Sequence, residues 1–330
     1  MTLNGQPLLF YVYFLNCLSY LASLKEWVTL DTYISTFCMR NYLHSRLLSL
    51  HGLFMVTVRI MSIYLILFII LSYLVWIRCI YCQHRRAFFK SLKHVMNVLS
   101  SRDTNCSEIS ALIVTAHPDD ECMFFAPTII RLVELNVSVH LLCLTEGNYY
   151  KQGAQRKQEL LKSCAMLGIP SSSITIVDHN KLPDDPTAEW SIPLVSSVIV
   201  KHIRAHSFNL VLTFDGKGVS GHANHRAIHK AVSHLASTGQ VPNDCSLLSL
   251  VTVGLFRKYI SFLELPISWL LPSCLCCIVG SRGYRQAKAA MLCHRSQLLW
   301  FRYLYITFSC YMFINTFQMI PQEPKNLKIY

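Results

Sequence analysis

Apolar runs typical of buried strands alternate with helical patterns through the middle of the chain. The expected strands cover residues 112–114, 138–145, 173–177 and 209–214. Between these runs, apolar positions recur at helical spacing. The expected helices cover residues 122–135, 155–167 and 194–206. Strands that alternate with helices at this spacing predict an α/β fold with a mostly parallel sheet and helices on both faces.

A long apolar segment precedes this region. Residues 60–77 carry no charge, are bounded by Arg59 and Arg78, and approach the ~20 residues that a helix needs to cross a bilayer core. We therefore expect a transmembrane helix over residues 59–79, and the alternative is a buried core helix. More basic residues follow this segment than precede it nearby, so the positive-inside rule predicts that the following part of the chain lies in the cytosol.

The chain has further expected divisions on either side of the membrane segment. Residues 1–58 are an N-terminal extension without assigned chemistry, and residues 80–108 are a basic juxtamembrane linker. Residues 109–320 form the expected catalytic domain, and residues 321–330 are a tail. Within the domain, residues 303–320 are long enough to cross a membrane but include polar side chains such as Asn315. We favour a membrane-associating helix that lies on the bilayer or docks on the sheet over a second span.

The charge balance limits the classes of partner. Lysine and arginine together number 30 against 18 acidic residues, a net charge of +12, which favours an anionic partner such as a phospholipid surface, a phosphorylated lipid or nucleic acid. Because no basic stripe with interleaved aromatic residues is present, nucleic acid is not an expected partner. The 14 cysteines are scattered through apolar segments, which is typical of reduced thiols in a protein that faces the cytosol.

One imidazole and three carboxylates follow the first expected strand. They belong to His117, Asp119, Asp120 and Glu121, and Pro118 prevents the strand from continuing with a paired N–H. In an open α/β sheet, ligands bind at the C-terminal ends of the strands. Carboxylates crowded there would repel one another unless a cation or catalytic chemistry used them. The sequence therefore predicts a functional site at this point.

A second polar loop follows the expected strand at residues 209–214. The loop, residues 215–225, contains three glycines and ends with His222 and His225. These histidines are spaced i, i+3, so both rings face one cavity if His225 begins the next helix. Both polar clusters fall at the C-terminal ends of strands, where one crevice can collect them. Histidine and carboxylate ligands with almost no thiol suit a zinc ion held for hydrolysis, with an open coordination position for water.

Two motifs carry a resemblance to a known family. Residues 116–121 (AHPDDE) and 220–225 (SGHANH) resemble those of the LmbE-like zinc-dependent N-acetylglucosamine deacetylases. Further segments are similar to the eukaryotic branch of this family, which deacetylates N-acetylglucosaminylphosphatidylinositol: residues 123–128, 147–150, 167–170, 183–186 and 293–301. The resemblance implies a Rossmann-like (LmbE-like) fold over roughly residues 109–318 and leaves residues 1–58 uncovered.

The resemblance also implies roles for the clustered residues. His117, Asp120 and His225 would bind Zn²⁺ or another divalent metal. Asp119 would act as the general base, and His222 would polarise the substrate carbonyl. Many bacterial relatives have aspartate where this chain has Asn224, so the sequence leaves the protonation state of His222 open.

Other polar residues near the motifs have structural interpretations. Glu121 is expected to support the ligands or the first helical turn instead of binding metal. Asp184 and Asp185 flank a proline-rich turn, which is typical of solvated acids. Arg156 and Glu159 lie one helical turn apart and are expected to pair.

Substrate contacts have weaker signals. Arg295 is the arginine that we would assign to a substrate phosphate, with a simple exposed residue as the alternative. Tyr149, Tyr150 and Trp300 either line the path of the sugar or lipid or are buried in the core.

Taken with the residues, the resemblance implies a membrane-anchored, metal-dependent hydrolase. It would remove the N-acetyl group from N-acetylglucosaminylphosphatidylinositol in GPI-anchor biosynthesis, as a single-pass protein of the endoplasmic reticulum membrane with its catalytic domain in the cytosol. One alternative is a deacetylase of a soluble N-acetylglucosaminide, and another is an inactive membrane scaffold of the same fold. The expected partners are the membrane and the glycolipid substrate, and the sequence leaves protein partners open.

Overall fold

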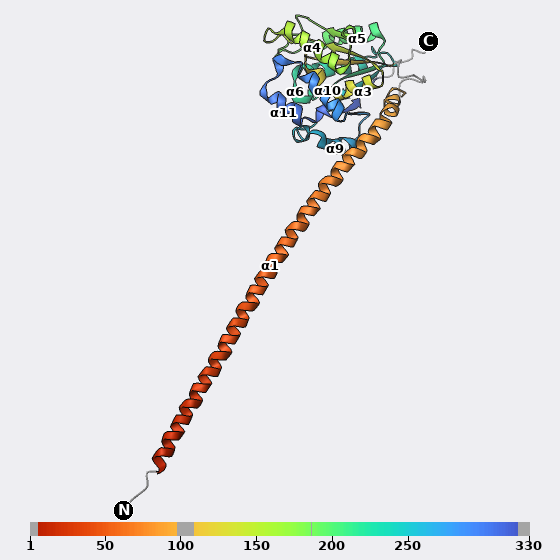
Figure 1. Ribbon diagram of the computed structural model, residues 1–330. Helices are drawn as coiled ribbons and strands as arrows, with labels where there is room; N and C mark the ends of the chain where they lie inside the picture. The colour runs from red at the N-terminus through yellow and green to blue at the C-terminus, as the bar shows by residue number, and fades with distance from the viewer. Residues whose placement is uncertain (1–5, 98–108, 186, 323–330) are drawn as a thin grey trace, which may run out of the picture. The chain divides into compact units, whose positions relative to one another are not determined.

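The computed structural model describes residues 6–97, 109–185 and 187–322 of the chain (Figure 1). It divides into two compact units, residues 1–73 and residues 74–330. The first unit contains most of one long helix, α1 (Gln6–Asn97), whose last turns belong to the second unit. The second unit contains every strand of the described residues and the candidate site.

The apolar N-terminal part of α1 agrees with the expected membrane segment. Residues Asp31–Met96 include an 18-residue window with a mean hydropathy of 2.6, and none of that window is buried. Among the described residues this is the one helix that is long and apolar enough to cross a membrane. The alternative of a buried core helix does not fit, because such a helix would hide this surface inside the protein.

The expected linker at residues 80–108 differs from the structure. Residues 80–97 continue α1 and pack on the α/β unit, because Ile80, Phe88 and Leu92 recur at helical spacing and are almost completely buried. Nε2 of His84, on the same face, lies 2.7 Å from the carbonyl oxygen of Cys276. The polar segment 98–108 lies outside the described residues. The basic part of the expected linker is thus a docked helix.

A seven-stranded sheet forms the centre of the second unit, in the order β3-β2-β1-β4-β5-β7-β6. The strands are β1 (Ser110–Thr115), β2 (Ser138–Cys143), β3 (Ile174–Ile176), β4 (Leu210–Phe214), β5 (Ser246–Leu250), β6 (Leu275–Ile278) and β7 (Ile314–Met319). Neighbours from β3 to β5 pair in parallel, whereas β7 is antiparallel to both β5 and β6. The prediction of a mostly parallel sheet is therefore confirmed.

Helices cover the sheet on both faces, since every residue of β4 and β5 is buried. Helix α7 packs on β4 and on α5, while α3 packs on β2 and β6 beside α4 and α10. The helices of the second unit are α2 (Asp120–Phe124), α3 (Ala126–Glu134), α4 (Gly153–Leu167), α5 (Ile192–His206), α6 (Gly218–Gly221), α7 (Ala223–Ser237), α8 (Leu255–Lys258), α9 (Leu265–Leu270), α10 (Ser281–Met291) and α11 (Trp300–Phe308). Short 3₁₀ turns are η2 (Ser171–Ser173), η3 (Ser261–Glu264), η4 (Arg295–Gln297) and η5 (Cys310–Met312).

The expectation of a helix or second span over residues 303–320 is wrong. Helix α11 ends at Phe308, and strand β7 enters the sheet between β5 and β6. The polar side chains that disfavoured a membrane span find partners there. Asn315 accepts hydrogen bonds from the Thr128 hydroxyl and backbone N–H and donates one to the carbonyl oxygen of Phe124. Asn315 therefore joins β7 to the helices beside the catalytic loop.

Candidate active site

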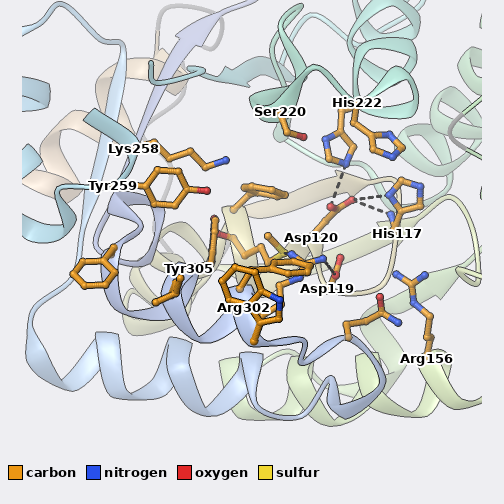
Figure 2. A pocket seen from close by; sticks show the side chains of 18 of the residues that line it. His117, Asp119, Asp120, Arg156, Ser220, His222, Lys258, Tyr259, Arg302 and Tyr305 are labelled. Atoms are coloured by element: carbon orange, nitrogen blue, oxygen red, sulfur yellow. Dashed lines mark hydrogen bonds and ion pairs between the residues drawn. The ribbon is translucent and has the colours of Figure 1, made fainter. Parts of the chain in front are cut away.

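A cavity of about 630 Å³ opens at the C-terminal ends of β1 and β4 (Figure 2). After β1 the chain builds the sheet to one side through β2 and β3, and it then returns to add β4 and β5 on the other side. Ligands bind at such a reversal of strand order in open α/β sheets, because the loops after the two strands diverge and leave a crevice. Both expected polar clusters reach this cavity, since His117, Asp119, Asp120, His222 and His225 line it.

The loop after β1 presents its two aspartates in different ways. Oδ2 of Asp120 accepts hydrogen bonds from the backbone N–H groups of Ala116 and His117 at 3.0 and 2.9 Å. This pairing holds the side chain in place and turns Oδ1 toward the second loop. Asp119 adopts a left-handed backbone conformation with φ of 115°, which is uncommon for a residue other than glycine. Both carboxylates are almost completely buried.

Asp215 shapes the loop after β4. Its Oδ1 accepts hydrogen bonds from the backbone N–H of Gly218 and from the Thr252 hydroxyl, while Oδ2 accepts one from the Thr252 N–H. The resulting tight turn brings the carbonyl oxygen of Gly218 within 3.1 Å of Nδ1 of His225. Because that carbonyl can only accept, Nδ1 carries the proton and Nε2 of His225 presents a lone pair to the cavity.

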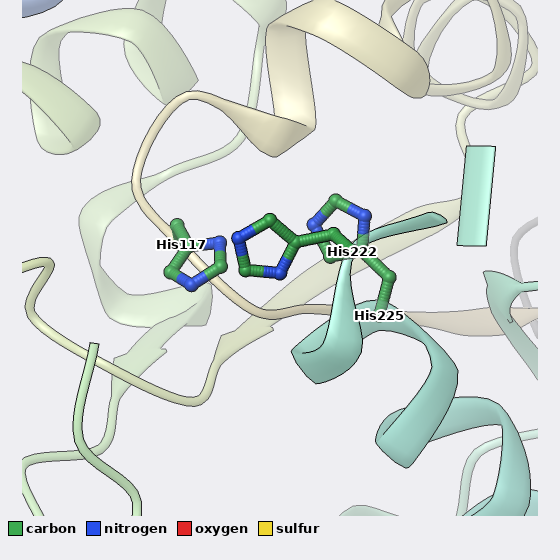
Figure 3. A group of neighbouring side chains, drawn as sticks. All are labelled: His117, His222 and His225. Carbon is green, nitrogen blue, oxygen red and sulfur yellow. The ribbon is translucent and has the colours of Figure 1, made fainter. Parts of the chain in front are cut away.

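Three imidazole rings meet at this point (Figure 3). His117, His222 and His225 each offer a nitrogen atom, and these atoms lie within 4.8 Å of one another. Nε2 of His225 also lies 3.1 Å from Oδ1 of Asp120, within ion-pair distance. An imidazole nitrogen and a carboxylate oxygen that converge in a buried position can hold a proton between them or bind a cation in its place. The donor set of two imidazoles and one carboxylate fits a catalytic zinc ion or a similar divalent metal.

The two ring nitrogens of His117 face different carboxylates, those of Asp120 and Asp184. Its Nδ1 lies 3.8 Å from Oδ2 of Asp120, whereas its Nε2 lies 3.2 Å from Oδ1 of Asp184 and 3.0 Å from the Asn224 amide. The interpretation of Asp184 as a solvated turn acid is therefore wrong, since its side chain is only 12 % exposed. Asp184 lines the cavity and orients a metal-binding candidate, whereas Asp185 is half-buried and contacts Thr187.

The expected pair between Arg156 and Glu159 is absent. Nη1 of Arg156 binds Oδ2 of Asp184 at 3.1 Å, and Nη2 donates to the carbonyl oxygen of Pro118 at 2.8 Å. Glu159 instead accepts hydrogen bonds from the hydroxyl and backbone N–H of Ser296. Local spacing suggested a helical pair, but burial of both side chains against neighbouring loops supplies stronger partners. Arg156 thus fixes the loop after β1.

Arg302, from α11, reaches the candidate general base. Its Nη2 donates a hydrogen bond to Oδ2 of Asp119 at 3.0 Å, and Oδ1 of Asp119 has no hydrogen-bond partner among the described residues. Burial raises the pKa of the Asp119 carboxyl, and the guanidinium group of Arg302 opposes this rise. Sequence reasoning missed Arg302, although it directly follows the motif at residues 293–301.

The structure defines the tautomer of His222 that the sequence left open. The backbone N–H of Asn224 donates a hydrogen bond to Nδ1 of His222 at 3.3 Å, so the neutral ring carries its proton on Nε2. Burial and the nearby His225 ring lower the pKa of His222, which favours the neutral form. The side chain of Asn224 does not contact His222 and faces His117 instead. His222 is therefore an N–H donor at the cavity.

Glu121 lies behind the cavity in a buried network. Its Oε2 accepts the backbone N–H of Asp119 at 3.0 Å, and its Oε1 contacts Nε2 of His294 at 2.7 Å and the Ser163 hydroxyl. Burial disfavours the charged carboxylate, but His294 and the hydrogen bonds hold the pKa of Glu121 below its ordinary value. Glu121 does not line the cavity, so its geometry matches the supporting role expected from the sequence.

The candidate substrate residues lie in different places. Arg295 is exposed and does not line the cavity. Tyr149 and Tyr150 are also largely exposed and lie outside its lining, whereas Trp300 is part of its rim. The cations that do line the cavity are Arg156, Lys258 and Arg302.

An α/β sheet with a histidine and aspartate cluster at its switch point, and a second buried acid beside that cluster, defines a hydrolase of the metal-dependent class. Comparison with known proteins identifies the family. The family model "PIG-L: GlcNAc-PI de-N-acetylase" matches residues 112–236. The chain belongs to this family.

Named relatives extend the match beyond the segment that the family model covers. The N-acetylglucosaminyl-phosphatidylinositol de-N-acetylase of Bos taurus is 50% identical over 209 residues, covering 63% of this chain and 83% of the relative. A probable enzyme of the same name from Schizosaccharomyces pombe is 35% identical over 228 residues, covering 66% of this chain and 90% of the relative. Among solved structures, N,N'-diacetylchitobiose deacetylase from Pyrococcus horikoshii matches with a TM-score of 0.48 and 17% identity, covering 71% of this chain and 93% of that one.

Proposed function

We propose that the protein is a membrane-anchored, metal-dependent hydrolase that removes the N-acetyl group from N-acetylglucosaminylphosphatidylinositol. The products are glucosaminylphosphatidylinositol and acetate, in an early step of GPI-anchor biosynthesis. One observation carries the proposal: in a chain 50% identical over 209 residues to the bovine de-N-acetylase, Nε2 of His225 and Oδ1 of Asp120 converge at 3.1 Å beside a buried acid, Asp119.

His117 and His225, two of the three clustered histidines, and Asp120, whose Oδ1 lies 3.1 Å from Nε2 of His225, are the residues that would hold the divalent metal, with Zn²⁺ as the first candidate. When bound, such an ion acidifies water and polarises a carbonyl oxygen as a Lewis acid. Asp184 and the Gly218 carbonyl orient the two imidazoles through the ring nitrogens that would not bind the metal. These contacts fix which nitrogen of each ring faces the ligand.

Asp119 acts first as the general base and then as the general acid of the reaction. Its unpaired Oδ1 accepts a proton from the attacking water as the new C–O bond forms at the acetyl carbonyl. It then gives that proton to the sugar nitrogen when the C–N bond breaks, so that acetate and a free amine leave. Burial favours this exchange, because it raises the pKa of Asp119 toward that of a useful base.

His222 stabilises the negative charge that develops on the carbonyl oxygen. Its Nε2–H is the proton-bearing side of the ring, because Nδ1 accepts the Asn224 backbone N–H. A fixed donor aimed at a developing oxyanion contributes about 3 kcal/mol to transition-state binding. His222 performs this role as a neutral imidazole.

The shape and charge of the cavity support a phosphate-linked lipid over a soluble sugar. Lys258 lines it and offers a cation for the substrate phosphodiester, whereas Arg302 is paired with Asp119 and Arg295 lies outside. Two exposed aromatic side chains belong to the elements that form the cavity: Trp300 lines it and is 76% exposed, and Phe256, on α8 with the lining residue Lys258, is 91% exposed. Apolar side chains left in water at this density are typical of a surface that meets a membrane.

We place the protein in the endoplasmic reticulum membrane with one span and its α/β unit in the cytosol. The support is the apolar segment of α1 and the basic residues that follow it, which include Arg78, Arg85, Arg86 and Lys90. A cytosolic α/β unit also agrees with the reduced cysteines among the described residues.

The test uses the full-length protein purified in detergent. We expect it to release acetate from N-acetylglucosaminylphosphatidylinositol, to contain a divalent metal, and to lose activity with a chelator or with Asp119→Asn. Activity that survives both treatments would overturn the mechanism. Equal turnover of a lipid-free N-acetylglucosaminide would favour the soluble-substrate alternative. Rescue of deacetylase-deficient cells by His117→Ala would favour the scaffold alternative.

A further inference from the structure

A second cavity lies where the docked end of α1 meets the start of α10. It has a volume of about 670 Å³ and shares no lining residue with the catalytic cavity. From α1 it receives Arg78 and Arg85, which lie two turns apart on one helix face, and from α10 it receives Arg282. The ring of Tyr81 packs so closely on Gly280 that a Cβ there would approach it within 2.9 Å. This contact fixes the two walls together.

No acidic side chain in the lining balances the positive charge of this cavity. The guanidinium groups of Arg78, Arg85 and Arg282 have no hydrogen-bond or ion-pair partner among the described residues. Helix α10 begins here with no acidic residue in its first turn and no side-chain cap. Its first N–H groups and its dipole add positive potential, and an arginine at this end of a helix is unfavourable unless an anion is present. The cavity therefore has the charge of an anion site.

The rest of the wall is apolar. Leu74, Ile77, Phe262, Leu265 and Phe313 line the cavity beside the arginines. A free phosphate would satisfy the arginines and leave this surface uncovered. A molecule with a phosphate and a hydrocarbon chain would cover both parts.

We propose that this cavity binds an anionic glycerophospholipid of the surrounding bilayer, which is distinct from the substrate. The phosphate lies against Arg78, Arg85 and Arg282, and an acyl chain follows the apolar wall. The apolar segment of α1 ends at Ile77, so Arg78 falls at headgroup level if α1 crosses the membrane. Arg85 lies about 10 Å further along the helix, which long arginine side chains can bridge on one headgroup. The bound lipid would hold the α/β unit against the cytosolic leaflet.

The experiment measures lipid binding to the full-length protein in neutral detergent micelles. Phosphatidylserine or phosphatidylcholine is titrated in, and bound lipid is counted by native mass spectrometry. We expect saturable binding of phosphatidylserine over phosphatidylcholine. Basic residues near anionic lipid contribute about 1 kcal/mol each, so the triple variant Arg78→Gln, Arg85→Gln, Arg282→Gln should bind phosphatidylserine on the order of 100-fold more weakly.

A matched variant removes equal charge from exposed residues of the same helices that do not line the cavity: Arg86→Gln, Lys90→Gln and Arg285→Gln. It should lose less than about twofold, because isolated surface charges interact weakly. Equal losses in the two variants would show diffuse attraction and overturn the site, as would unchanged binding in both. Glycerol 3-phosphate should not displace the lipid, and displacement at equal concentration would assign the site to a free phosphate. Phe262→Ser should weaken the binding of lipid, and an unchanged affinity would also contradict the acyl-chain contact.

Discussion

Arg302 and Asp119 are 183 residues apart in the chain and are joined by a hydrogen bond of 3.0 Å between Nη2 and Oδ2. The bond ties α11 to the loop after β1. It fixes one oxygen of the buried carboxylate and leaves the other turned to the cavity. Because Asp119 adopts a strained left-handed conformation, its carboxylate depends on such a contact for its position.

Arg302→Met should therefore lower kcat for deacetylation on the order of 100-fold, the effect of displacing a reactive group by about 1 Å. The metal content should stay unchanged, since Arg302 contacts none of the proposed ligands, and Arg302→Lys should recover part of kcat. Steady-state kinetics and metal analysis of the same samples check this. Arg295→Met is the matched control and should leave kcat near the wild-type value. Equal losses from both substitutions would contradict a positioning role for Arg302.

Asp184 should govern metal affinity without binding the metal. Its Oδ1 lies 3.2 Å from Nε2 of His117, and removal of such an outer carboxylate typically costs 10–100-fold in metal affinity. We expect this loss in Asp184→Asn, measured by competition with a chelator of known affinity. Asp185→Asn is the control, because Asp185 is the neighbour in the same turn and, among the described residues, forms hydrogen bonds with Thr187 and Ala188 and not with His117. An unchanged affinity in Asp184→Asn would show that His117 needs no partner.

The sequence was sufficient to predict that the two polar loops meet. Short apolar runs buried on both faces indicate parallel strands, and parallel strands place their C-terminal ends at one edge of a sheet. Strands β1 and β4 are neighbours in the structure, so the rings of His117 and His225 lie close together. Asn224, which precedes His225, contacts His117 across 107 residues of the chain. Hydrophobic pattern and motif position carry this part of the prediction.

Residues whose role depends on distant contacts could not be predicted in this way. Asp184 lies between prolines in a sequence that is typical of an exposed turn, and only the fold brings Arg156 and His117 to it. Asn315 made residues 303–320 look like a poor membrane helix, whereas it is a buried residue of a strand. In both cases local pattern describes the segment, and tertiary packing decides what the polar side chain does.

His84 should make folding stability depend on pH. Burial lowers the pKa of His84 from 6.5 to about 4, so the unfolded chain binds a proton that the folded protein excludes as the pH falls below 6.5. Stability should decrease by about 2 kcal/mol from this residue between pH 7 and pH 5. Thermal unfolding of the full-length protein in detergent at both pH values measures the effect. His84→Gln should reduce the pH dependence, whereas the exposed control His234→Gln should retain it.

The exposed side chain of Phe256 should affect turnover of the lipid-linked substrate and not of a soluble one. Burial of a large apolar side chain in a membrane contributes about 1.5–3 kcal/mol, so Phe256→Ser should raise KM for the glycolipid in vesicles on the order of 10-fold or more. A soluble N-acetylglucosamine phosphodiester should show no change, because Phe256 lies outside the cavity lining. Met166→Ser removes another exposed apolar side chain, on α4, as a control. An equal rise in KM for both substrates would assign Phe256 to the catalytic site instead.

Asn136 reports the orientation of the α/β unit. The sequence Asn136-Val137-Ser138 is a glycosylation acceptor, and Asn136 is exposed at the end of α3 in a left-handed conformation with φ of 59°. We expect no glycan there in cells, because the cytosolic side of the membrane lacks the modification. Leu43→Thr creates an acceptor at Asn41, before the apolar segment, and should gain a glycan on the luminal side. A gel shift on glycosidase treatment checks both sites, and a glycan on Asn136 would reverse the proposed topology.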